Sequence, residues 1–398
     1  MTISFVLTPE GWDLLNSLPP YEESAVFQLS ERLRRDGFAP DVVSAALTQS
    51  RLRARGAAKF GEFARTMVFT KDGLEQATRL EVGAFHARRL LDAGATKVID
   101  LGCGIGADSM AFASLGLDVV AIERDEETAA AATVNLRHFP NAEVIMADGR
   151  EADLASFGAD AIWIDPARRI NGARIKDPAK WMPSLAEALE LAGRFDSAGI
   201  KVAPGIDYSD LPSNSRVEWI SAGGDLLEAV IWLGRAAAEP GRRALLLGQV
   251  SGSVEWDAGV SDPRVPAVAV TPEELGPYIF EPDPAIIRSG SIASVCREFG
   301  MAPVSDSIAY LTGPEPVDSP LLSAFAVLGV LPIEAKAVRK ALAKAGIGRV
   351  EIKKRGTDLS PDAFRLKLKL DDSLPGSATL IATPLLGRHR MVLAERLS

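Results

Sequence analysis

Three glycines and the acidic residues around them are the residue types in this chain best suited to binding a ligand. Gly102, Gly104 and Gly106 lie in VIDLGCGIGADS, directly after an apolar stretch that is typical of a buried strand. Glycine permits a tight turn and lets a ligand approach bare backbone, and the helix that follows presents unpaired N–H groups. The spacing therefore predicts a ligand-binding turn between a strand and a helix.

Acidic residues end the neighbouring predicted strands. Asp100 lies two residues before the first glycine, where a carboxylate attracts an ammonium group and repels a pyrophosphate. Glu123 ends the next strand and suits ribose hydroxyls, whereas Asp148 ends the third and suits an adenine amine. Asp165 follows the fourth. These residues favour a nucleoside that carries a cationic amino-acid group, but NAD or FAD remains an alternative because the turn also fits GxGxxA, ending at Ala107.

The elements that must position these residues alternate between short strands and helices from about residue 95. The series runs TKVIDLG, ADSMAFASLG, LDVVAIE, EETAAAATVNLRHF, AEVIMAD, ADAIWIDP, PSLAEALELAGRF and GIKVAPG. Such alternation predicts an α/β fold with a parallel sheet covered by helices on both faces. RVEWISA, DLLEAVIWLG and RRALLLG then look like antiparallel strands that finish the sheet.

Four parts follow from this pattern. Residues 1–66 are predicted to form a helical N-terminal domain, and 67–250 the α/β domain. Residues 251–320 are predicted as a linker and helical segment, and 321–398 as a small α+β domain. The first part carries clustered cations that suit either a solvated helix face or a phosphate-contacting surface: Arg51, Arg53, Arg55, Lys59 and Arg65.

Composition excludes several classes of protein. The net charge of −9 argues against a uniformly basic nucleic-acid binder, although local basic patches are permitted. Only two cysteines, Cys103 and Cys296, and three scattered histidines are present, so we predict neither disulfides nor a metal site. Apolar stretches are too short to span a bilayer, and the N-terminus lacks the pattern of a signal peptide. We therefore expect a cytoplasmic protein that does not contact membranes.

The motifs at the strand ends resemble those of a known enzyme class. VIDLGCGIGAD, VVAIE, MADG and WIDPARR together look like the motifs of class I S-adenosylmethionine-dependent methyltransferases, over roughly residues 70 to 250. The resemblance implies a Rossmann-like core with a mostly parallel, seven-stranded type of sheet, and S-adenosyl-L-methionine as cofactor. The cofactor-binding residues that it implies are Gln76, Thr78, Asp100, Gly102, Gly104, Gly106, Asp108, Glu123, Arg124, Asp148 and Gly149.

The motif after the fourth strand bears on the reaction. Asp165 and Pro166 resemble the DPP-type motif of nucleic-acid methyltransferases, in which the acidic side chain and a proline carbonyl hold the target amine. Ala167 and Arg168 depart from that pattern. DP-x-R is also similar to 5-methyluridine methyltransferases, but those need a cysteine after the fifth strand, and GIKVAPGID has none. Transfer to nitrogen or oxygen remains, with Asp165, Pro166 and Arg168 as predicted catalytic residues and Arg169 as a substrate contact.

The chain as a whole resembles a bacterial subfamily in which a THUMP-like domain follows the methyltransferase core. The stretches that carry this resemblance are LTQSRLRARGAAKFG, KDGLEQATR, IDPARR, EPDPAIIRSG and VEIKKRGTDLSPDAFRLKLKL. THUMP-type domains are associated with RNA binding, so the resemblance implies an RNA substrate. Lys353, Lys354 and Arg355 are the predicted RNA contacts of that domain, and a further run of cations, from Lys336 to Lys344, lies on one predicted helix.

Three readings of function stay open at this point. The first is an RNA methyltransferase acting on rRNA or tRNA. The second keeps the cofactor but gives it a small-molecule or protein acceptor, which the acidic net charge favours. The third is an RNA-binding protein whose core holds the cofactor without turnover, which the altered motif after the fourth strand suggests. The sequence does not fix the oligomeric state.

Overall fold

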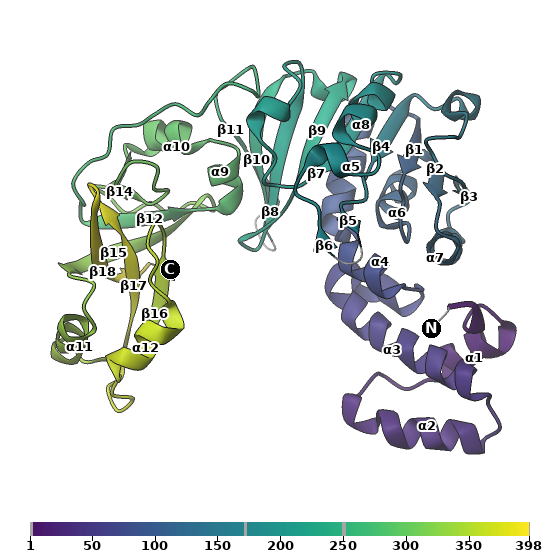
Figure 1. Ribbon diagram of the computed structural model, residues 1–398, viewed down its shortest axis with the longest axis horizontal. Helices are drawn as coiled ribbons and strands as arrows, with labels where there is room; N and C mark the ends of the chain where they lie inside the picture. Colours follow the sequence, from purple (N-terminus) through teal and green to yellow (C-terminus); the bar gives the residue numbers. More distant parts are fainter. Residues whose placement is uncertain (1–2, 171–172, 249–251, 398) are drawn as a thin grey trace. The chain divides into compact units, whose positions relative to one another are not determined.

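The computed structural model describes residues 3–170, 173–248 and 252–397 (Figure 1). The chain divides into two compact units. The first comprises residues 1–203 and 230–238, and the second comprises residues 204–229 and 239–398. Strand β9 (Asp225–Gly234) contributes residues to both units.

Helices form the N-terminal part of the first unit. They are α1 (Pro9–Ser17), α2 (Val26–Arg35), α3 (Pro40–Phe60), α4 (Lys71–Gln76) and α5 (Leu80–Asp92). Proline begins α1 and α3, where a missing N–H costs nothing. The Thr8 side chain accepts a hydrogen bond from Gly11 N and so caps α1. Buried aliphatic side chains such as Leu14, Leu33 and Val43 pack α1, α2 and α3 together.

Parallel strands form the centre of the first unit. They are β1 (Lys97–Leu101), β2 (Asp118–Glu123), β3 (Ala142–Met146), β4 (Ala161–Ile164) and β7 (Ser197–Val202), in the spatial order β3-β2-β1-β4-β7. Helices α6 (Ala107–Ser114), α7 (Glu126–Leu136) and α8 (Leu185–Ala192) connect them. The strand order reverses between β1 and β4, and such a reversal opens a crevice at the carboxyl ends of the strands.

The complete sheet has nine strands in the order β11-β10-β8-β9-β7-β4-β1-β2-β3. The seven strands from β3 to β8 form the predicted seven-stranded type of core, and the Rossmann-like fold class is confirmed. β8 (Arg216–Ala222), β10 (Gly241–Gly248) and β11 (Gly252–Asp257) complete the order. A short pair, β5 (Arg169–Ile170) and β6 (Ala173–Arg174), lies after β4.

One strand pairing differs from the prediction. β10 pairs with β8 in parallel, not antiparallel, and its Gly241 lies opposite Arg216 at the start of β8. The two-glycine turn at Gly223 and Gly224 sends β9 back to that end, so β10 begins where β8 began and runs in the same direction. The sequence pattern of a hairpin does not reveal which of its two strands a third strand will pair with, and that choice decides whether the pairing is parallel or antiparallel.

A second sheet lies in the second unit. Its strands are β12 (Tyr278–Pro282), β13 (Ala302–Pro303), β14 (Leu311–Gly313), β15 (Leu322–Leu331), β16 (Ile347–Lys354), β17 (Gly376–Leu385) and β18 (Arg388–Arg396), in the order β13-β14-β12-β15-β18-β17-β16. The helices of this unit are α9 (Pro284–Arg288), α10 (Ile292–Phe299), α11 (Ala335–Lys344) and α12 (Pro361–Leu368). Val338 and Leu342 of α11 and Phe364 of α12 are buried in one cluster with residues of β16 to β18.

The stretch predicted as a linker and helical segment, 251–320, differs from that description. It contains β11 and also β12, β13 and β14, which join the C-terminal sheet. These strands are two to six residues long and include prolines, so they leave little periodicity in the sequence. None of the described helices is long and apolar enough to cross a membrane. Among the described residues, no group of three His, Cys, Asp or Glu side chains could hold a metal ion.

Candidate functional site

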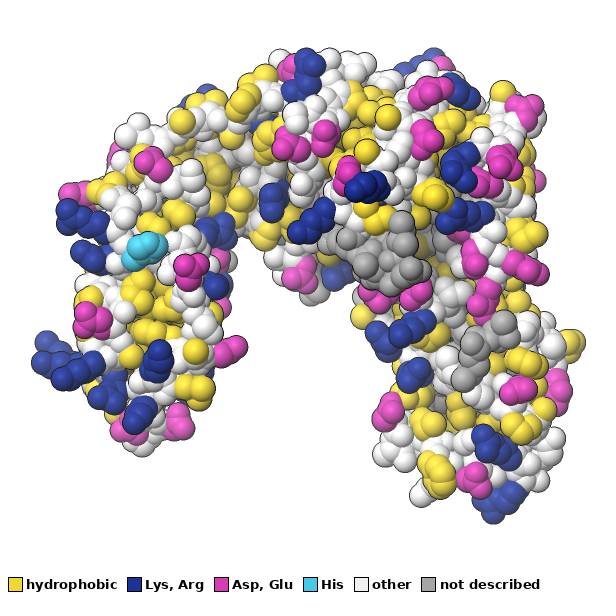
Figure 2. Space-filling view, viewed as in Figure 1, with side chains coloured by type: hydrophobic (Ala, Val, Ile, Leu, Met, Phe, Trp, Pro, Cys, Tyr) yellow, Lys and Arg dark blue, Asp and Glu magenta, His cyan; other side chains and the backbone are white. Residues whose placement is uncertain are grey.

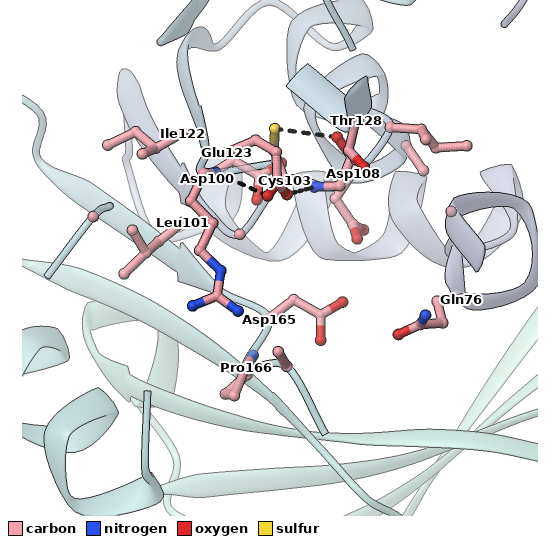
Figure 3. A pocket seen from close by; sticks show the side chains of 18 of the residues that line it. Gln76, Asp100, Leu101, Cys103, Asp108, Ile122, Glu123, Thr128, Asp165 and Pro166 are labelled. Atoms are coloured by element: carbon pink, nitrogen blue, oxygen red, sulfur yellow. Dashed lines mark hydrogen bonds between the residues drawn. The ribbon is translucent and has the colours of Figure 1, made fainter. Parts of the chain in front are cut away.

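A cavity of about 270 Å³ lies in the first unit, at the carboxyl ends of β1, β2 and β4. Its size is near the lower end of the range for small-molecule sites. Side chains from the glycine turn, the strand ends and α4 surround it (Figure 3). The predicted site residues that line it are Gln76, Thr78, Asp100, Gly102, Gly104, Asp108, Glu123, Arg124, Asp148, Gly149, Asp165 and Pro166.

The glycine turn has the backbone conformation that only glycine adopts without strain. Gly102 and Gly104 have φ of +81° and +57°. A Cβ on Gly102 would lie 2.8 Å from the backbone oxygen of Asp165, so a side chain there would separate the ends of β1 and β4. Gly106, with φ of +84°, precedes α6 and does not line the cavity. Its role is to start the helix.

Glu123 fixes the turn from the neighbouring strand. Its carboxylate accepts hydrogen bonds from the backbone N of Gly104 (3.1 Å), Arg124 (2.8 Å) and Asp125 (2.9 Å). The same carboxylate borders the cavity. It is therefore held in one place by backbone donors while its outer lone pairs are available to hydroxyl groups of a ligand.

Asp100 is the most deeply buried carboxylate of the site, with 1% of its surface exposed. Ser109 donates a hydrogen bond to Asp100 Oδ2, whereas Oδ1 has no partner among the described residues. Burial, followed by the charges of Asp108 and Asp165, raises the pKa of Asp100 well above its ordinary value. A buried oxygen without a partner favours a ligand that brings a donor, and the amino group of a methionine-type ligand fits that requirement.

Asp148 lies at the other end of the cavity and is paired with Arg150. Arg150 donates to both carboxylate oxygens, from Nε to Oδ1 (3.0 Å) and from Nη2 to Oδ2 (2.5 Å). These hydrogen bonds lower the pKa of Asp148 to about 2, so its carboxylate is charged at neutral pH. A charged carboxylate that also borders the cavity suits an amine donor such as the exocyclic group of adenine.

Asp165 begins a chain of polar contacts that the sequence did not reveal. Lys201 Nζ donates to Asp165 Oδ2 (3.0 Å) and to Thr78 Oγ1 (2.8 Å). Thr78 in turn donates to Asp108 (2.6 Å), which contacts His86 Nδ1 (2.8 Å). Asp165 and Gln76 point into the same open part of the cavity from different sides (Figure 3).

One feature of the sequence distinguishes Lys201, which is the one charged residue of the otherwise apolar segment GIKVAPG. His86 has no metal-ligand spacing in the sequence, and no other pattern there indicates its role. Cys103 lies in the turn and borders the cavity, but burial raises the pKa of its thiol well above the ordinary value. That environment does not activate a nucleophile.

Arg168 is not among the described residues that line the cavity. The Arg168 guanidinium lies 6.0 Å from the centre of the Trp181 ring, and the backbone of Ala167 exchanges hydrogen bonds with Met182. These contacts tie the segment after β4 to the segment before α8. Arg169 begins β5, and its side chain lies outside the described part of the structure.

Two of the three predicted RNA contacts in the second unit are paired with acidic residues. Lys353 Nζ lies 2.7 Å from Glu281 and 3.4 Å from Glu351. Arg355 lies 3.6 Å from Glu281 and over the ring of Tyr310. Lys354 is exposed.

Helix α11 presents more accessible cations than this strand does. Its exposed cations are Lys336, Arg339, Lys340 and Lys344. Figure 2 shows Lys and Arg side chains gathered over the part of the second unit where Figure 1 places α11. This helix is therefore a better candidate for phosphate contact than Lys353 and Arg355.

Two of the five clustered cations of the N-terminal helices, Lys59 and Arg53, serve as structural donors. Lys59 Nζ donates to the carbonyls of Leu74, Glu75 and Ala77 and so caps the end of α4. Arg53 donates to Met67 O. Arg65 pairs with Glu62, while Arg51 and Arg55 are exposed.

Comparisons with known proteins give a consistent result. An uncharacterised S-adenosylmethionine-dependent methyltransferase of Mycobacterium tuberculosis is 33% identical over 363 residues, which cover 86% of this chain and 93% of that protein. The crystal structure of a candidate methyltransferase from Porphyromonas gingivalis W83 matches 96% of this chain and 100% of that one, with a TM-score of 0.72 and 22% identity.

Family models match both ends of the chain. The model described as THUMP domain-like matches residues 322–396, which confirms the predicted THUMP-like C-terminal domain. A domain of unknown function, DUF8688, matches residues 1–56. From the identity and coverage of the mycobacterial relative and the architecture of the site, the chain belongs to the S-adenosylmethionine-dependent methyltransferases and uses S-adenosyl-L-methionine as its cofactor.

Proposed function

We propose that this protein transfers a methyl group from S-adenosylmethionine to a nitrogen or oxygen atom of RNA, in rRNA or tRNA. The observation that carries the proposal is the position of Asp165, which borders the cavity at the end of β4 and directs its carboxylate into the open space (Figure 3). The THUMP-like match and the exposed cations of α11 support RNA as the substrate class.

Each residue at a strand end contacts a different part of the cofactor in this proposal. Asp100 receives the amino group of the methionine part, which satisfies its buried Oδ1. Glu123 accepts from the ribose hydroxyls, and Asp148 accepts from the adenine amine. Gln76 and Thr78, which border the same cavity, face the methionine end, and the bare turn at Gly102 and Gly104 lets the ligand approach the backbone.

The bound cofactor supplies a methyl carbon that is activated by a sulfonium. Transfer to a lone pair of the acceptor would leave the electrons of the carbon–sulfur bond on sulfur, and the proton lost by the acceptor would pass to solvent. Asp165 accepts a hydrogen bond from the acceptor N–H or O–H, and the Pro166 carbonyl accepts a second one. Orientation and local charge then account for most of the acceleration that the protein provides.

Arg168 acts indirectly in this scheme. Its guanidinium packs near Trp181 and holds the segment that follows Pro166, so it shapes the acceptor side of the site without entering the cavity. Arg169, Lys353, Lys354 and Arg355 remain proposed RNA contacts. Of these we assign the weaker contributions to Lys353 and Arg355, because Glu281 already neutralises them.

The experiment is a label-transfer assay. Purified protein is incubated with radiolabelled S-adenosylmethionine and total bacterial RNA, and half of each sample is then digested with ribonuclease. The proposal expects label in material that ribonuclease destroys. Label that appears only in protein or in small molecules would contradict RNA as the substrate, and cofactor binding without transfer to any fraction would favour an RNA-binding role without turnover.

A variant of α11 sharpens the assay. Replacing Lys340 with Glu reverses an exposed charge on α11, and we expect weaker RNA binding with a reduced salt slope of about one unit. Glu334→Lys, at the start of the same helix, is the matched opposite change and is expected to strengthen binding. Equal RNA affinity for both variants would exclude α11 from the RNA surface.

A further inference from the structure

A buried lysine at the end of β7 lies directly behind the proposed catalytic carboxylate. We infer that Lys201 is a positioning residue of the methyl-transfer site, which holds Asp165 in its productive orientation as part of a fixed chain running from Asp165 to His86. This inference rests on the proposed role of Asp165. It assigns a function to Lys201 and His86, which neither the motifs nor the comparisons single out.

The geometry places Lys201 behind the cavity and not in it. Its side chain is 5% exposed, against 28% for Asp165, and Lys201 itself is absent from the cavity lining. Its ammonium donates to Asp165 Oδ2 at 3.0 Å and to Thr78 Oγ1 at 2.8 Å. Lys201 therefore acts on an acceptor through the side chains that it contacts, of which Asp165 is the proposed catalytic one.

Donor and acceptor capacities give the chain a single direction. An ammonium group can only donate, so Thr78 Oγ1 must accept from Lys201. The one hydroxyl hydrogen of Thr78 is then available for Asp108 Oδ2, at 2.6 Å. Thr78 therefore accepts from Lys201 and donates to Asp108, and these two hydrogen bonds cannot run in the opposite direction.

The far end of the chain is anchored in the core. Asp108 Oδ1 lies 2.8 Å from His86 Nδ1, and the His86 ring stacks on Trp163 with ring centres 4.2 Å apart. His86 and Trp163 are fully buried. Because packing fixes the ring, it also fixes the carboxylate of Asp108 and the residues that follow it toward Asp165.

The positive charge of Lys201 also acts on the carboxylates around it. Three carboxylates from different elements meet in this corner: Asp100 on β1, Asp108 on α6 and Asp165 after β4. His86 on α5 and Lys201 on β7 face them, and Arg124 borders the same cavity after β2. The Lys201 charge acts to lower the pKa of both Asp100 and Asp108, so its removal favours protonation in the corner.

Lys201→Met in the full chain tests the inference, because it removes the charge and keeps most of the length. We expect the affinity for S-adenosylhomocysteine, measured by calorimetry, to change by less than about threefold, since Lys201 does not border the cavity. Methyl transfer to total RNA should slow by about 10- to 100-fold, and the acidic fall-off of its rate should move up by about one pH unit. A wild-type rate with a wild-type pH profile overturns the inference.

Two further variants separate positioning from mere support of the fold. Lys201→Arg keeps the charge and should recover part of the rate and the original pH profile; equal loss in the Arg and Met variants overturns the inference. Lys97→Met, at the amino end of β1 and away from the cavity, is the control and should leave both unchanged. If Lys201→Met does not fold, Lys201→Gln keeps a polar side chain without the charge and is expected to slow transfer with little change in S-adenosylhomocysteine affinity, because Lys201 does not border the cavity; an unchanged rate overturns the inference.

A spectroscopic measurement keeps this test independent of the substrate. If the wild type labels no RNA, the proposed function fails, and the carboxyl ¹³C signal of Asp165 in the S-adenosylhomocysteine complex decides about Lys201. The inference expects the chemical shift of that signal at neutral pH to differ between Lys201→Met and the wild type, because the variant loses the contact from the ammonium to Asp165 Oδ2. Identical chemical shifts overturn it whether or not RNA is methylated.

Discussion

The cavity of the first unit and the cationic residues predicted on the second unit, Lys353 to Arg355, differ in how the structure places the predicted side chains. Asp100, Glu123, Asp148 and Asp165 all border the cavity. In the second unit, by contrast, Lys353 and Arg355 contact Glu281, whereas Lys354 is exposed. Residue type and spacing predicted both sets, but only the four acidic residues of the first unit all lie at one site.

The reason for the difference is geometric. In a parallel sheet the carboxyl ends of the strands lie at one edge, so residues that directly follow neighbouring strands lie close together. A cation on a strand or helix has no such constraint, because an acidic residue far away in sequence can neutralise it. Glu281 and Lys353 are 72 residues apart. Topology therefore makes strand-end residues predictable and leaves surface charges open.

The largest effect is expected at the cavity. Asp165→Asn keeps the shape of the side chain but removes the charge that accepts from the acceptor group and pairs with Lys201. We expect methyl transfer to fall by roughly 10²- to 10³-fold, while S-adenosylhomocysteine still binds. Single-turnover assays with labelled cofactor measure the transfer. Asp177→Asn, in an exposed cap at Pro178–Lys180, is the matched control, and an equal loss in both variants would remove Asp165 from the reaction.

An intermediate effect is expected at the cationic residues of the second unit. Glu281→Gln releases Lys353 and Arg355, so RNA binding should strengthen severalfold and its salt dependence should steepen by about one to two charges. Filter binding across a series of salt concentrations measures both. No change in the salt slope would mean that RNA does not contact β16. None of the residues predicted there would then share a site in the way that the cavity residues do.

The smallest effect is expected at Asp148. Arg150→Ala removes the side-chain hydrogen bonds, which are the largest cause of the lowering of the Asp148 pKa to about 2, and keeps the one from its backbone N, so that pKa should rise part of the way toward 3.8. Because the folded-state pKa is depressed, the associated stabilisation is present above pH 3.8 and is lost as the pH falls toward 2. Carboxyl ¹³C titration measures the shift directly. An unchanged Asp148 midpoint in the variant would show that Arg150 is not its cause.

Much of the site was predictable because local rules decide it. The glycine turn needs positive φ, and the alternation of apolar strands with helices fixes the parallel order that brings Asp100 and Asp165 to one edge. Lys201 was not predicted, because a strand buried along its whole length gives no alternation from which to read where one polar side chain points. The chain through Thr78 to His86 is likewise set by tertiary packing.

The fold outside the core was less predictable for similar reasons. β12 and β14 are three to five residues long, and they are stabilised by pairing with each other and with β15 rather than by their own pattern. The direction of β10 depends on where β9 ends. In each case a contact between distant residues decides the outcome, and no window of the sequence contains both partners.

The account depends most directly on the cavity of the first unit being the cofactor site. Calorimetric titration of S-adenosylhomocysteine into the wild type and into Glu123→Ala tests this, with Glu126→Ala in the exposed first turn of α7 as the control. We predict one site per chain in the wild type, an affinity weaker by about 10- to 100-fold in Glu123→Ala, and no change in the control. Equal affinity in all three proteins would contradict the account.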